Sequence, residues 1–444
     1  MNWSGDNRRS ISSSSISRLR IVSNVALLWL VRVIALLCSA ILSVLTARFL
    51  GPTGRGVYTL PGIDASLGTT FAAGLSSAAA FYLLNRSAGR SIIRAASIVL
   101  FVFVVVGFGL TYATAAASHS LWAIAAGASF TLAYGAYSLA YGCFLGFDRA
   151  RSAGLLNAAA YVLTLALVCV ALLVQHPSPN LAIVAWVSGM AIAGIVGLAL
   201  VFRDAYRLRG ATVDVTGLLA FASRAGLLNL ANLLNYRIDI YIVAILAPVS
   251  VIGLYTLAVT GAESALSITL AISQATVPRI GRLEQAEAAA FTARCLRNSI
   301  FLAFLLALCG FIAAPVVVRL VFGSAYASIV TPLRVLLIGL VAASTSSVIS
   351  NYFMLNRGIT RIPLITSIIS TALCAAISVV LVPKLGMLGA AIGSTVAYIC
   401  SQSVAIGYFC YESNISWSST LLIDRDDVES YAGLVRRLVA AASK

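Results

Sequence analysis

Long apolar runs separated by short polar segments make up most of the chain. Runs of about 20 predominantly apolar residues are long enough for an α-helix to cross a bilayer, and twelve such runs are present. The first six lie at about 22–47, 57–84, 92–116, 120–145, 153–174 and 181–202. The second six lie at about 217–246, 250–275, 296–320, 328–355, 361–382 and 386–410. The pattern therefore predicts an all-α polytopic membrane protein with twelve transmembrane helices.

The connection between the first two predicted spans recurs about 197 residues later. The first copy reads ARFLGPTGRGVYTL at 47–60, and the second reads AILAPVSVIGLYTL at 244–257. A repeat this long indicates two homologous halves and not a solenoid of small units. Each half holds an even number of spans, so both halves enter the membrane in the same direction. We expect two parallel six-helix bundles related by a pseudo-two-fold axis along the membrane normal.

Polar segments set the expected domain boundaries. The predicted parts are a disordered basic cytoplasmic tail at 1–20, an N-terminal six-helix bundle at 21–203, a cytoplasmic linker at 204–216, a C-terminal six-helix bundle at 217–410, and a cytoplasmic tail at 411–444. In the last part, Val428, Tyr431, Val435 and Leu438 have helical spacing. This spacing predicts a surface amphipathic helix, and a helix that docks a partner is the alternative.

Composition and charge agree with this topology. Only 10% of the 444 residues are charged, whereas soluble domains carry about 25%. Outside the predicted spans, 22 Lys and Arg residues lie on the side of the N-terminus and 4 on the other side. The positive-inside rule then places both termini in the cytoplasm. The net charge of +16 is dispersed over short loops, which argues against a nucleic-acid partner.

No motif in the sequence indicates catalysis or a bound metal. None of the eight Cys residues is part of a CxxC pair, and His119 and His176 each stand alone in a short loop, so no metal site is predicted. There is no GxxxxGK[ST] phosphate loop for an ATP-driven motor. We therefore expect a transporter and not an enzyme, with no cofactor and with a proton or Na⁺ as the candidate coupling ion.

Charged side chains inside the predicted spans are the main functional clue, because each is costly unless it is hydrated or paired. They are Arg32, Asp64, Arg224, Arg237, Asp239, Glu263 and Arg334. Arg32 lies about ten residues into its span, roughly 15 Å deep at 1.5 Å per residue. Arg outnumbers the acids, and a guanidinium matches phosphate oxygens in two-point contacts. The set favours an anionic substrate group, although Arg237 and Arg334 could equally extend to the membrane surface.

The span at 217–246 carries a polar stripe. Arg224, Asn232, Asn235 and Asp239 fall within about 80° of one another on a helix. Such a stripe is expected of a wall of a water-filled cavity, and the alternative is that Asn235 and Asp239 bond neighbouring helices. Asp64 and Glu263 occupy near-equivalent places in the two repeats. They suit coupling to a proton or cation, or they act as counter-ions of Arg32 or Arg224.

Several segments resemble the Wzx-type polysaccharide flippases of the multidrug/oligosaccharidyl-lipid/polysaccharide exporter superfamily. The matching pieces are ARFLGPTGRGVYTL at 47–60, RIDIYIVAILAPVSVIGLYTLA at 237–258, VPRIGRL at 277–283, APVVVRLVFGSAYASIVTPLRVLLIG at 314–339 and LVPKLGMLGAAIGSTVAY at 381–398. The resemblance implies a central cationic cavity between two bundles. It also implies that the protein moves an undecaprenyl-pyrophosphate-linked glycan to the outer leaflet of a bacterial cytoplasmic membrane.

By this resemblance, Arg32, Arg224 and Arg237 would contact the pyrophosphate or acidic sugars. Asp239 would be their electrostatic partner or a coupling site. Membrane lipids, a polysaccharide polymerase and glycosyltransferases are the implied partners. Two rivals remain: a cation-coupled multidrug or small-molecule antiporter of the same superfamily, and a membrane glycosyl-processing enzyme. The enzyme would need a large outer loop, and every predicted outer loop is short.

Overall fold

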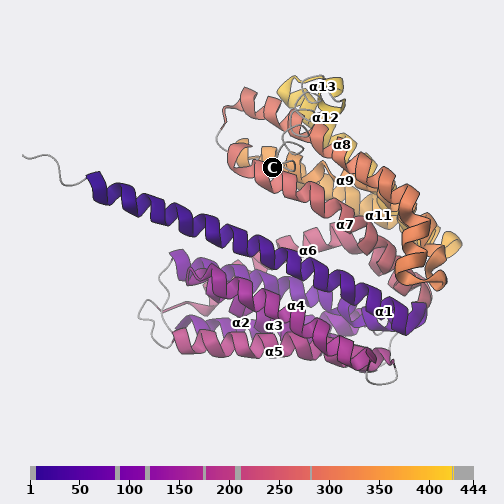
Figure 1. The fold of residues 1–444 in the computed structure, drawn as a ribbon, viewed down its shortest axis with the longest axis horizontal. Helices are drawn as coiled ribbons and strands as arrows, with labels where there is room; N and C mark the ends of the chain where they lie inside the picture. Colours follow the sequence, from indigo (N-terminus) through magenta and orange to yellow (C-terminus); the bar gives the residue numbers. More distant parts are fainter. Residues whose placement is uncertain are drawn as a thin grey trace, which may run out of the picture. The chain divides into compact units, whose positions relative to one another are not determined.

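The structure, a computed structural model, describes residues 7–85, 91–115, 121–173, 177–205, 212–280, 283–422 and 424, and all regular elements in these ranges are helical (Figure 1). The first half of the chain forms α1 (Asn7–Asn85), α2 (Ser91–Ala115), α3 (Leu121–Gly146), α4 (Ala150–Leu173) and α5 (Pro179–Ala205). The second half forms α6 (Val215–Leu246), α7 (Val249–Ile280), α8 (Gln285–Val317), η1 (Val318–Phe322), η2 (Ser324–Ile329), α9 (Val330–Ala343), α10 (Ser346–Asn351), η3 (Tyr352–Asn356), α11 (Arg361–Leu385), α12 (Met387–Ser413) and α13 (Trp417–Leu421).

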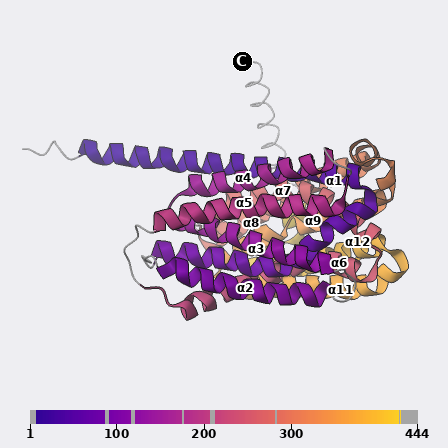
Figure 2. The same ribbon diagram turned by 90° about the horizontal axis from the view of Figure 1, so that it is seen from below.

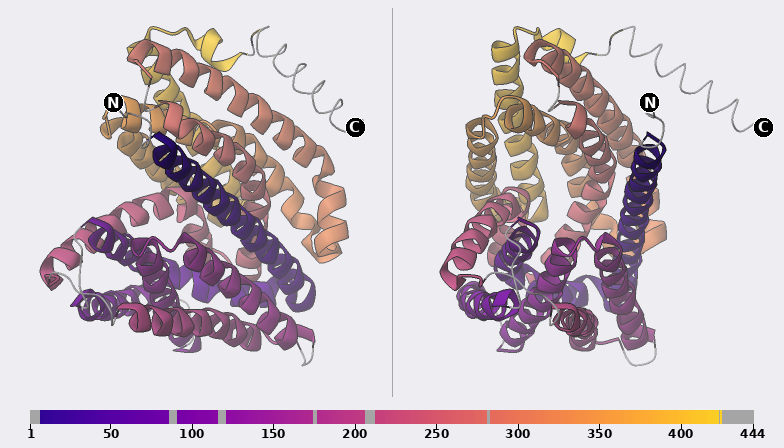
Figure 3. Two further views of the ribbon diagram at one scale, coloured as in Figure 1. Left: turned by 60° about the vertical axis from the view of Figure 1, so that its left-hand side comes forward. Right: turned by 90° about the vertical axis from the view of Figure 1, so that its left-hand side faces the viewer.

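The element α1 contains two spanning helices joined at Gly51. Gly51 has φ 67° and ψ 178°, a conformation essentially restricted to glycine. Four residues later, the buried Arg55 donates from Nη1 to the carbonyl of Ser43 at 3.0 Å and to Thr46 Oγ1 at 2.5 Å. In a straight helix Ser43 and Arg55 would be about 18 Å apart, so the chain reverses between them (Figure 3). The sequence placed Arg55 in an outer loop, but it is 4% exposed and stabilises this reversal.

The Gly51→Ala variant is expected to lose about 1–3 kcal/mol of unfolding free energy, because alanine must adopt a strained backbone conformation there. Thermal unfolding of the purified variant in detergent measures this loss. The matched control is Gly109→Ala in α2, where an added Cβ meets nothing within 4 Å and the helix gains propensity. Equal melting temperatures for the two variants would contradict the assignment of Gly51 as the conformational hinge.

The prediction of an all-α membrane protein with twelve spans is confirmed over the described residues. Ten helices or helical stretches there are long and apolar enough to cross a membrane, and one of them, Leu30–Leu84, contains both halves of α1. The remaining expected span corresponds to α7, which is 32 residues long and whose described apolar part, Val249–Ser264, is shorter than the other ten stretches. The second copy of the repeat joins α6 to α7 at Ala247 and Pro248, as the first joins the two halves of α1.

Two expected boundaries differ from the structure. Residues 7–20, expected to be disordered, belong to α1, because a helix nucleated by the following apolar residues extends at little further entropic cost. The chain divides into two compact units between Leu233 and Leu234. This boundary lies within α6 and not in the expected linker at 204–216. Residues 1–6, 116–120, 174–176, 206–211 and 425–444 lie outside the described residues. They include His119, His176 and the predicted helix at 428–438.

Unit 1 (Met1–Leu233) is held together by close contacts between small residues. Within it, α3 lies alongside both α2 and α5 (Figure 2). The beginning of α6 joins this unit because a Cβ on Gly74 of α1 would lie 2.4 Å from the carbonyl of Ala222 and 2.5 Å from the nitrogen of Gly226. Leu218 and Ala222 are buried in the same core. This contact explains why the unit boundary falls inside α6.

Unit 2 (Leu234–Lys444) packs α12 against both α9 and α11, and α8 against α7, α9 and α13. Its main cluster contains Tyr352, Phe353 and Phe409, with Tyr352 and Phe409 edge to face at 5.1 Å between ring centroids. A Cβ on Gly393 of α12 would lie 2.4 Å from Ser378 Oγ of α11. This close approach holds α12 in the centre of the unit, where it carries residues of the candidate site.

Asp214 caps the N-terminus of α6. It accepts hydrogen bonds from the hydroxyl of Thr216 at 2.6 Å and from the backbone N–H of Thr216 and Gly217. The Thr216 hydroxyl, followed by the two N–H groups, lowers the pKa of Asp214. A lowered pKa means that this stabilisation is present above the ordinary aspartate pKa of about 3.9 and is lost as the pH falls through the folded-state value.

We therefore expect Asp214→Ala to melt at a lower temperature than the wild type at pH 7, and Asp214→Ser, which retains a capping oxygen, to melt near the wild type. The difference between wild type and Asp214→Ala should shrink as the pH falls below the lowered pKa. Differential scanning fluorimetry across pH tests this sign. A difference that grows toward acid pH would contradict the capping role.

Candidate functional site

Asp239 is the centre of the candidate site in unit 2. Its carboxylate, 4% exposed, lies within the membrane-spanning part of α6. Oδ2 accepts hydrogen bonds from the Tyr255 hydroxyl of α7 at 2.5 Å and from Ser394 Oγ of α12 at 2.7 Å. Oδ1 accepts from the backbone N–H of Ile240 at 2.8 Å. One carboxylate therefore ties three spanning helices together and is hydrogen-bonded through neutral donors.

Arg237 and Glu263 form an ion pair next to this carboxylate. Arg237 Nη2 donates to Glu263 Oε2 at 2.8 Å, and the two side chains are 37% and 34% exposed. Arg237 precedes Asp239 by two residues, so the two side chains leave α6 in different directions. The pair balances the charge of Glu263 inside a span, where an unpaired charge is costly.

A small cavity separates the two carboxylates, and we call it the carboxylate pocket. Its polar lining is Tyr236, Asp239, Glu263, Ser394 and Tyr398, and α9 contributes apolar residues. The cavity has a volume of about 30 Å³, room for one or two water molecules. The pocket can therefore hold a water or a small ion within reach of both acids, but not a sugar or a pyrophosphate.

The structure brings together Arg237, Asp239 and Glu263 from the predicted set. Asn235, four residues before Asp239 in α6, has a buried Oδ1 that accepts no hydrogen bond from the described residues. Arg334 of α9 lies 4.6 Å from the ring centroid of Phe311 and donates from Nε to the Phe311 carbonyl at 2.9 Å. The contact with Phe311 therefore stabilises the charge of Arg334 within its span, and Arg334 does not line the carboxylate pocket.

The remaining predicted residues belong to unit 1. Arg32 in α1 is exposed within this unit, as are Arg224 and Asn232 in α6. Asp64 in α1 is 4% exposed. The repeat-related acids thus differ: Asp64 is enclosed in unit 1, whereas Glu263 is partly exposed beside Arg237.

Sequence reasoning missed the hydroxyl groups of the site. In the sequence, Tyr255 is only one residue of the repeated junction at 244–257, and Ser394 is only one residue of the segment at 381–398 that carries the resemblance. The repeat does not predict the hydrogen bond from Tyr255 to Asp239, because the equivalent tyrosine of the first copy has a different kind of partner. Tyr58, the counterpart of Tyr255, packs against Trp186 with ring centroids 5.8 Å apart. The signal available was the RxD sequence at 237–239 followed by Gly-x-Tyr at 253–255.

Comparisons with known proteins agree with this architecture. Residues 145–331 match the family described as "Polysaccharide biosynthesis protein", and no curated protein matches the chain. The fold is similar to "Lipid II flippase MurJ, inward closed conformation", with a TM-score of 0.69 and 13% identity, covering 88% of this chain and 87% of that chain.

Transporters of the MOP superfamily have the same fold. One is a multidrug resistance MATE family transporter in an inward-facing conformation, with a TM-score of 0.69 and 15% identity, covering 86% of this chain and 94% of that chain. Another is a MOP superfamily transporter from Pyrococcus furiosus, with a TM-score of 0.53 and 16% identity, covering 89% of this chain and 95% of that chain. The resemblance noted in the sequence is confirmed: this is a multi-pass membrane protein with the fold of MOP superfamily transporters, and its residues 145–331 match the polysaccharide biosynthesis protein family.

Proposed function

We propose that the protein is a flippase that moves a polyprenyl-pyrophosphate-linked oligosaccharide from the cytoplasmic to the outer leaflet of a bacterial cytoplasmic membrane, for the synthesis of a cell-surface polysaccharide. The match of residues 145–331 to a polysaccharide biosynthesis family is the observation that carries the proposal. The whole-chain similarity to a lipid II flippase supports it, because that protein's description names a lipid-linked substrate. In this proposal both termini are cytoplasmic, and a polymerase and glycosyltransferases are partners.

The anionic head group is bound by arginines that are exposed within unit 1. Arg32 and Arg224 lie inside predicted spans, and both are exposed in that unit, which leaves their guanidinium groups accessible to a phosphate. Transport follows alternating access between two halves. Movement of a pyrophosphate outward is favoured by an inside-negative potential, at about 2.3 kcal/mol per charge per 100 mV.

The carboxylate pocket supplies coupling. Asp239 is hydrogen-bonded by two hydroxyl groups and one backbone N–H. Gain of a proton would displace one of these donors, because the protonated oxygen has one acceptor position fewer. Glu263 has Arg237 as a direct partner and serves as its counter-ion. Of the two readings left open by the sequence, we assign coupling to Asp239 and charge balance to Glu263. Asp64, enclosed in unit 1, is the candidate coupling site of the first half.

The test is leaflet translocation in vesicles that contain the purified full chain. A fluorescent polyprenyl-pyrophosphate oligosaccharide is incorporated, and a membrane-impermeant reagent reports its arrival at the opposite leaflet. Arg32→Gln and Arg224→Gln are expected to lower the rate about tenfold or more, equivalent to ~1.4 kcal/mol of barrier each, while Arg32→Lys retains more activity. Arg319→Gln, in η1, is the control and is expected to leave the rate unchanged. Wild-type rates in both Arg32→Gln and Arg224→Gln would remove the cationic cavity from the proposal.

The second candidate is a cation-coupled antiporter of small molecules. It is favoured by the fold similarity to a multidrug resistance transporter, whose TM-score equals that of the lipid II flippase. The same vesicles decide between the two functions. Cation-driven efflux of a small dye without translocation of the lipid-linked oligosaccharide would establish the antiporter and overturn the flippase.

A further inference from the structure

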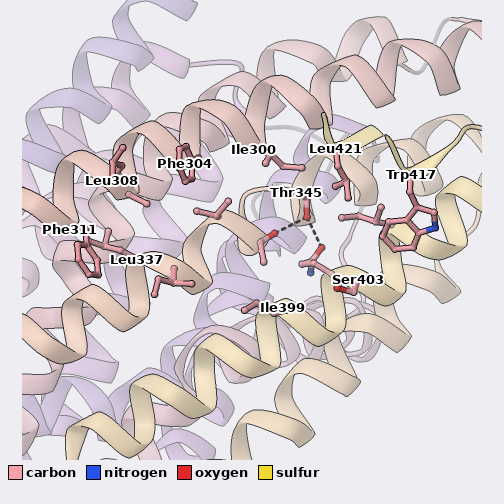
Figure 4. A pocket seen from close by; sticks show the side chains of 16 residues that line it. Ile300, Phe304, Leu308, Phe311, Leu337, Thr345, Ile399, Ser403, Trp417 and Leu421 are labelled. Carbon is pink, nitrogen blue, oxygen red and sulfur yellow. Dashed lines mark hydrogen bonds between the residues drawn. The ribbon is translucent and has the colours of Figure 1, made fainter. Parts of the chain in front are cut away.

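A long apolar groove lies between α8, α9, α12 and α13 of unit 2 (Figure 4). Ile300, Phe304 and Phe311 of α8 line one wall, and Leu337 of α9 and Ile399 of α12 line the others. The volume is about 570 Å³, within the range of about 300–1,000 Å³ typical of small-molecule sites. Because α8 and α12 are spanning helices, the groove lies where lipid hydrocarbon surrounds the protein.

The groove changes from apolar to polar along its length. Figure 4 shows Phe311, Leu308 and Leu337 toward one end, and Ser403 and Trp417 toward the other. Thr345, in the turn between α9 and α10, lies between them and contacts Gln402 at 3.2 Å. The polar groups therefore gather toward α13.

Gln402 has unused hydrogen-bonding capacity at this point. Its side chain is 7% exposed, and its one hydrogen bond to the described residues joins it to Thr345 Oγ1. An amide has two donors and an acceptor. Whichever way the group is turned, a polar atom is left for a ligand.

A cation lies beyond the polar end of the groove. Arg297 precedes Ile300 by three residues and so shares the groove-lining face of α8, and its guanidinium donates to the carbonyl of Ser419 in α13. Trp417 of α13 lines the same end, and tryptophan is enriched at the membrane–water interface. From Arg297 to Phe311, α8 rises about 21 Å, close to half of the 40–45 Å thickness of a whole bilayer.

We propose that this groove binds one glycerophospholipid with an anionic head group, from the leaflet on the α13 side. The acyl chain lies along α8 toward Phe311, an ester carbonyl accepts from the Gln402 amide, and the phosphate lies near Arg297. A polyprenyl chain fits the groove less well, since it is hydrocarbon throughout and offers Gln402 no partner. The site is separate from the carboxylate pocket and does not depend on the identity of the transported substrate.

Photolabelling tests this assignment on the full chain in lipid nanodiscs. The probes are phosphatidylglycerol and phosphatidylcholine, each with a photoactivatable diazirine on the acyl chain. We expect phosphatidylglycerol to label peptides of α8 and α12 about tenfold more strongly than phosphatidylcholine, a ratio that corresponds to ~1.4 kcal/mol. Ala342→Phe, which fills the groove, and Gln402→Leu, which removes the amide, are each expected to lower this labelling about tenfold.

Two further variants distinguish head-group from chain binding. Arg297→Gln is expected to abolish the preference for phosphatidylglycerol while labelling persists, and Arg319→Gln, the matched control, is expected to keep the preference. If Ala342→Phe does not fold, Leu308→Trp on the open rim of the groove replaces it. Unchanged labelling in the groove-filling variant, equal labelling by both lipids in the wild type, or stronger competition by polyprenyl phosphate than by phosphatidylglycerol would each overturn the proposal.

Discussion

Replacement of Asp239 by leucine is expected to destabilise unit 2 by about 2–5 kcal/mol, because the hydroxyl groups of Tyr255 and Ser394 both lose their acceptor in a buried place. Thermal unfolding in detergent gives the loss of stability. Tyr255→Phe alone removes one hydrogen bond to a charged group and is expected to cost about 1.5–3 kcal/mol. The effects of Tyr255→Phe and Ser394→Ala should not add, since both side chains donate to the same oxygen.

The Asp239→Asn variant separates charge from packing. Asparagine retains one oxygen that accepts from Tyr255 and Ser394, but its NH2 group replaces the oxygen that accepts from the Ile240 N–H. The melting temperature should therefore fall less than in Asp239→Leu. Translocation is expected to fall about tenfold or more, or ~1.4 kcal/mol in the barrier, if the carboxylate carries the coupling proton. Thr256→Val is the control, because among the described residues this buried hydroxyl bonds only within its own helix, to the carbonyls of Ile252 and Gly253. Wild-type transport by Asp239→Asn would reduce Asp239 to a structural hydrogen-bond acceptor.

Single neutralisation of the Arg237–Glu263 pair is expected to have the second large effect. Glu263→Gln removes the negative charge next to Arg237, and Arg237→Gln removes the guanidinium that donates to Glu263 Oε2. A charge in the centre of a spanning helix costs about 2.5–3.5 kcal/mol, and the partial exposure of both side chains should keep the measured loss of stability near the lower end. Both single variants should therefore show less folded protein and slower translocation than the wild type.

The double variant Arg237→Gln/Glu263→Gln decides between charge balance and coupling. If Glu263 is a counter-ion, removal of both charges restores folding and much of the transport, and the charge-reversed pair Arg237→Glu/Glu263→Arg does the same. A double variant that folds normally but does not transport would show that Glu263 or Arg237 takes part in transport directly. The surface pair Arg149 and Asp204 is the matched control, because exposed ion pairs contribute about 0–1 kcal/mol.

The twelve spans, the reversal at Gly51 and the matching junction at Pro248 could be predicted because they depend on local properties. A run of about 20 apolar residues crosses a bilayer whatever its neighbours are, and a Leu-Gly-Pro turn ends a helix through backbone conformation alone. The charged positions within spans could also be identified, since a charge in an apolar run is unusual in any membrane protein. These features need no knowledge of which helices are neighbours.

The partners of those charges depend on packing between distant segments. Helical periodicity placed Asp239 on a polar stripe, but the covering of that stripe by Tyr255 and Ser394 depends on how closely α7 and α12 approach α6. Ser394 lies 155 residues from Asp239 in the chain, so no local pattern around either residue indicates that the two side chains form a hydrogen bond. Similarly, Arg55 has the sequence context of a loop residue, and only the reversal of α1 brings Ser43 within its reach.

The two repeats also show which features depend on local sequence and which depend on packing between helices. Local sequence specifies a helix junction followed by Gly-x-Tyr in both halves, and both junctions form. Tyr58 nevertheless packs on an indole ring and Tyr255 donates to a carboxylate. The partner of a side chain is supplied by whichever helix covers it, and that depends on long-range packing that no window of local sequence contains.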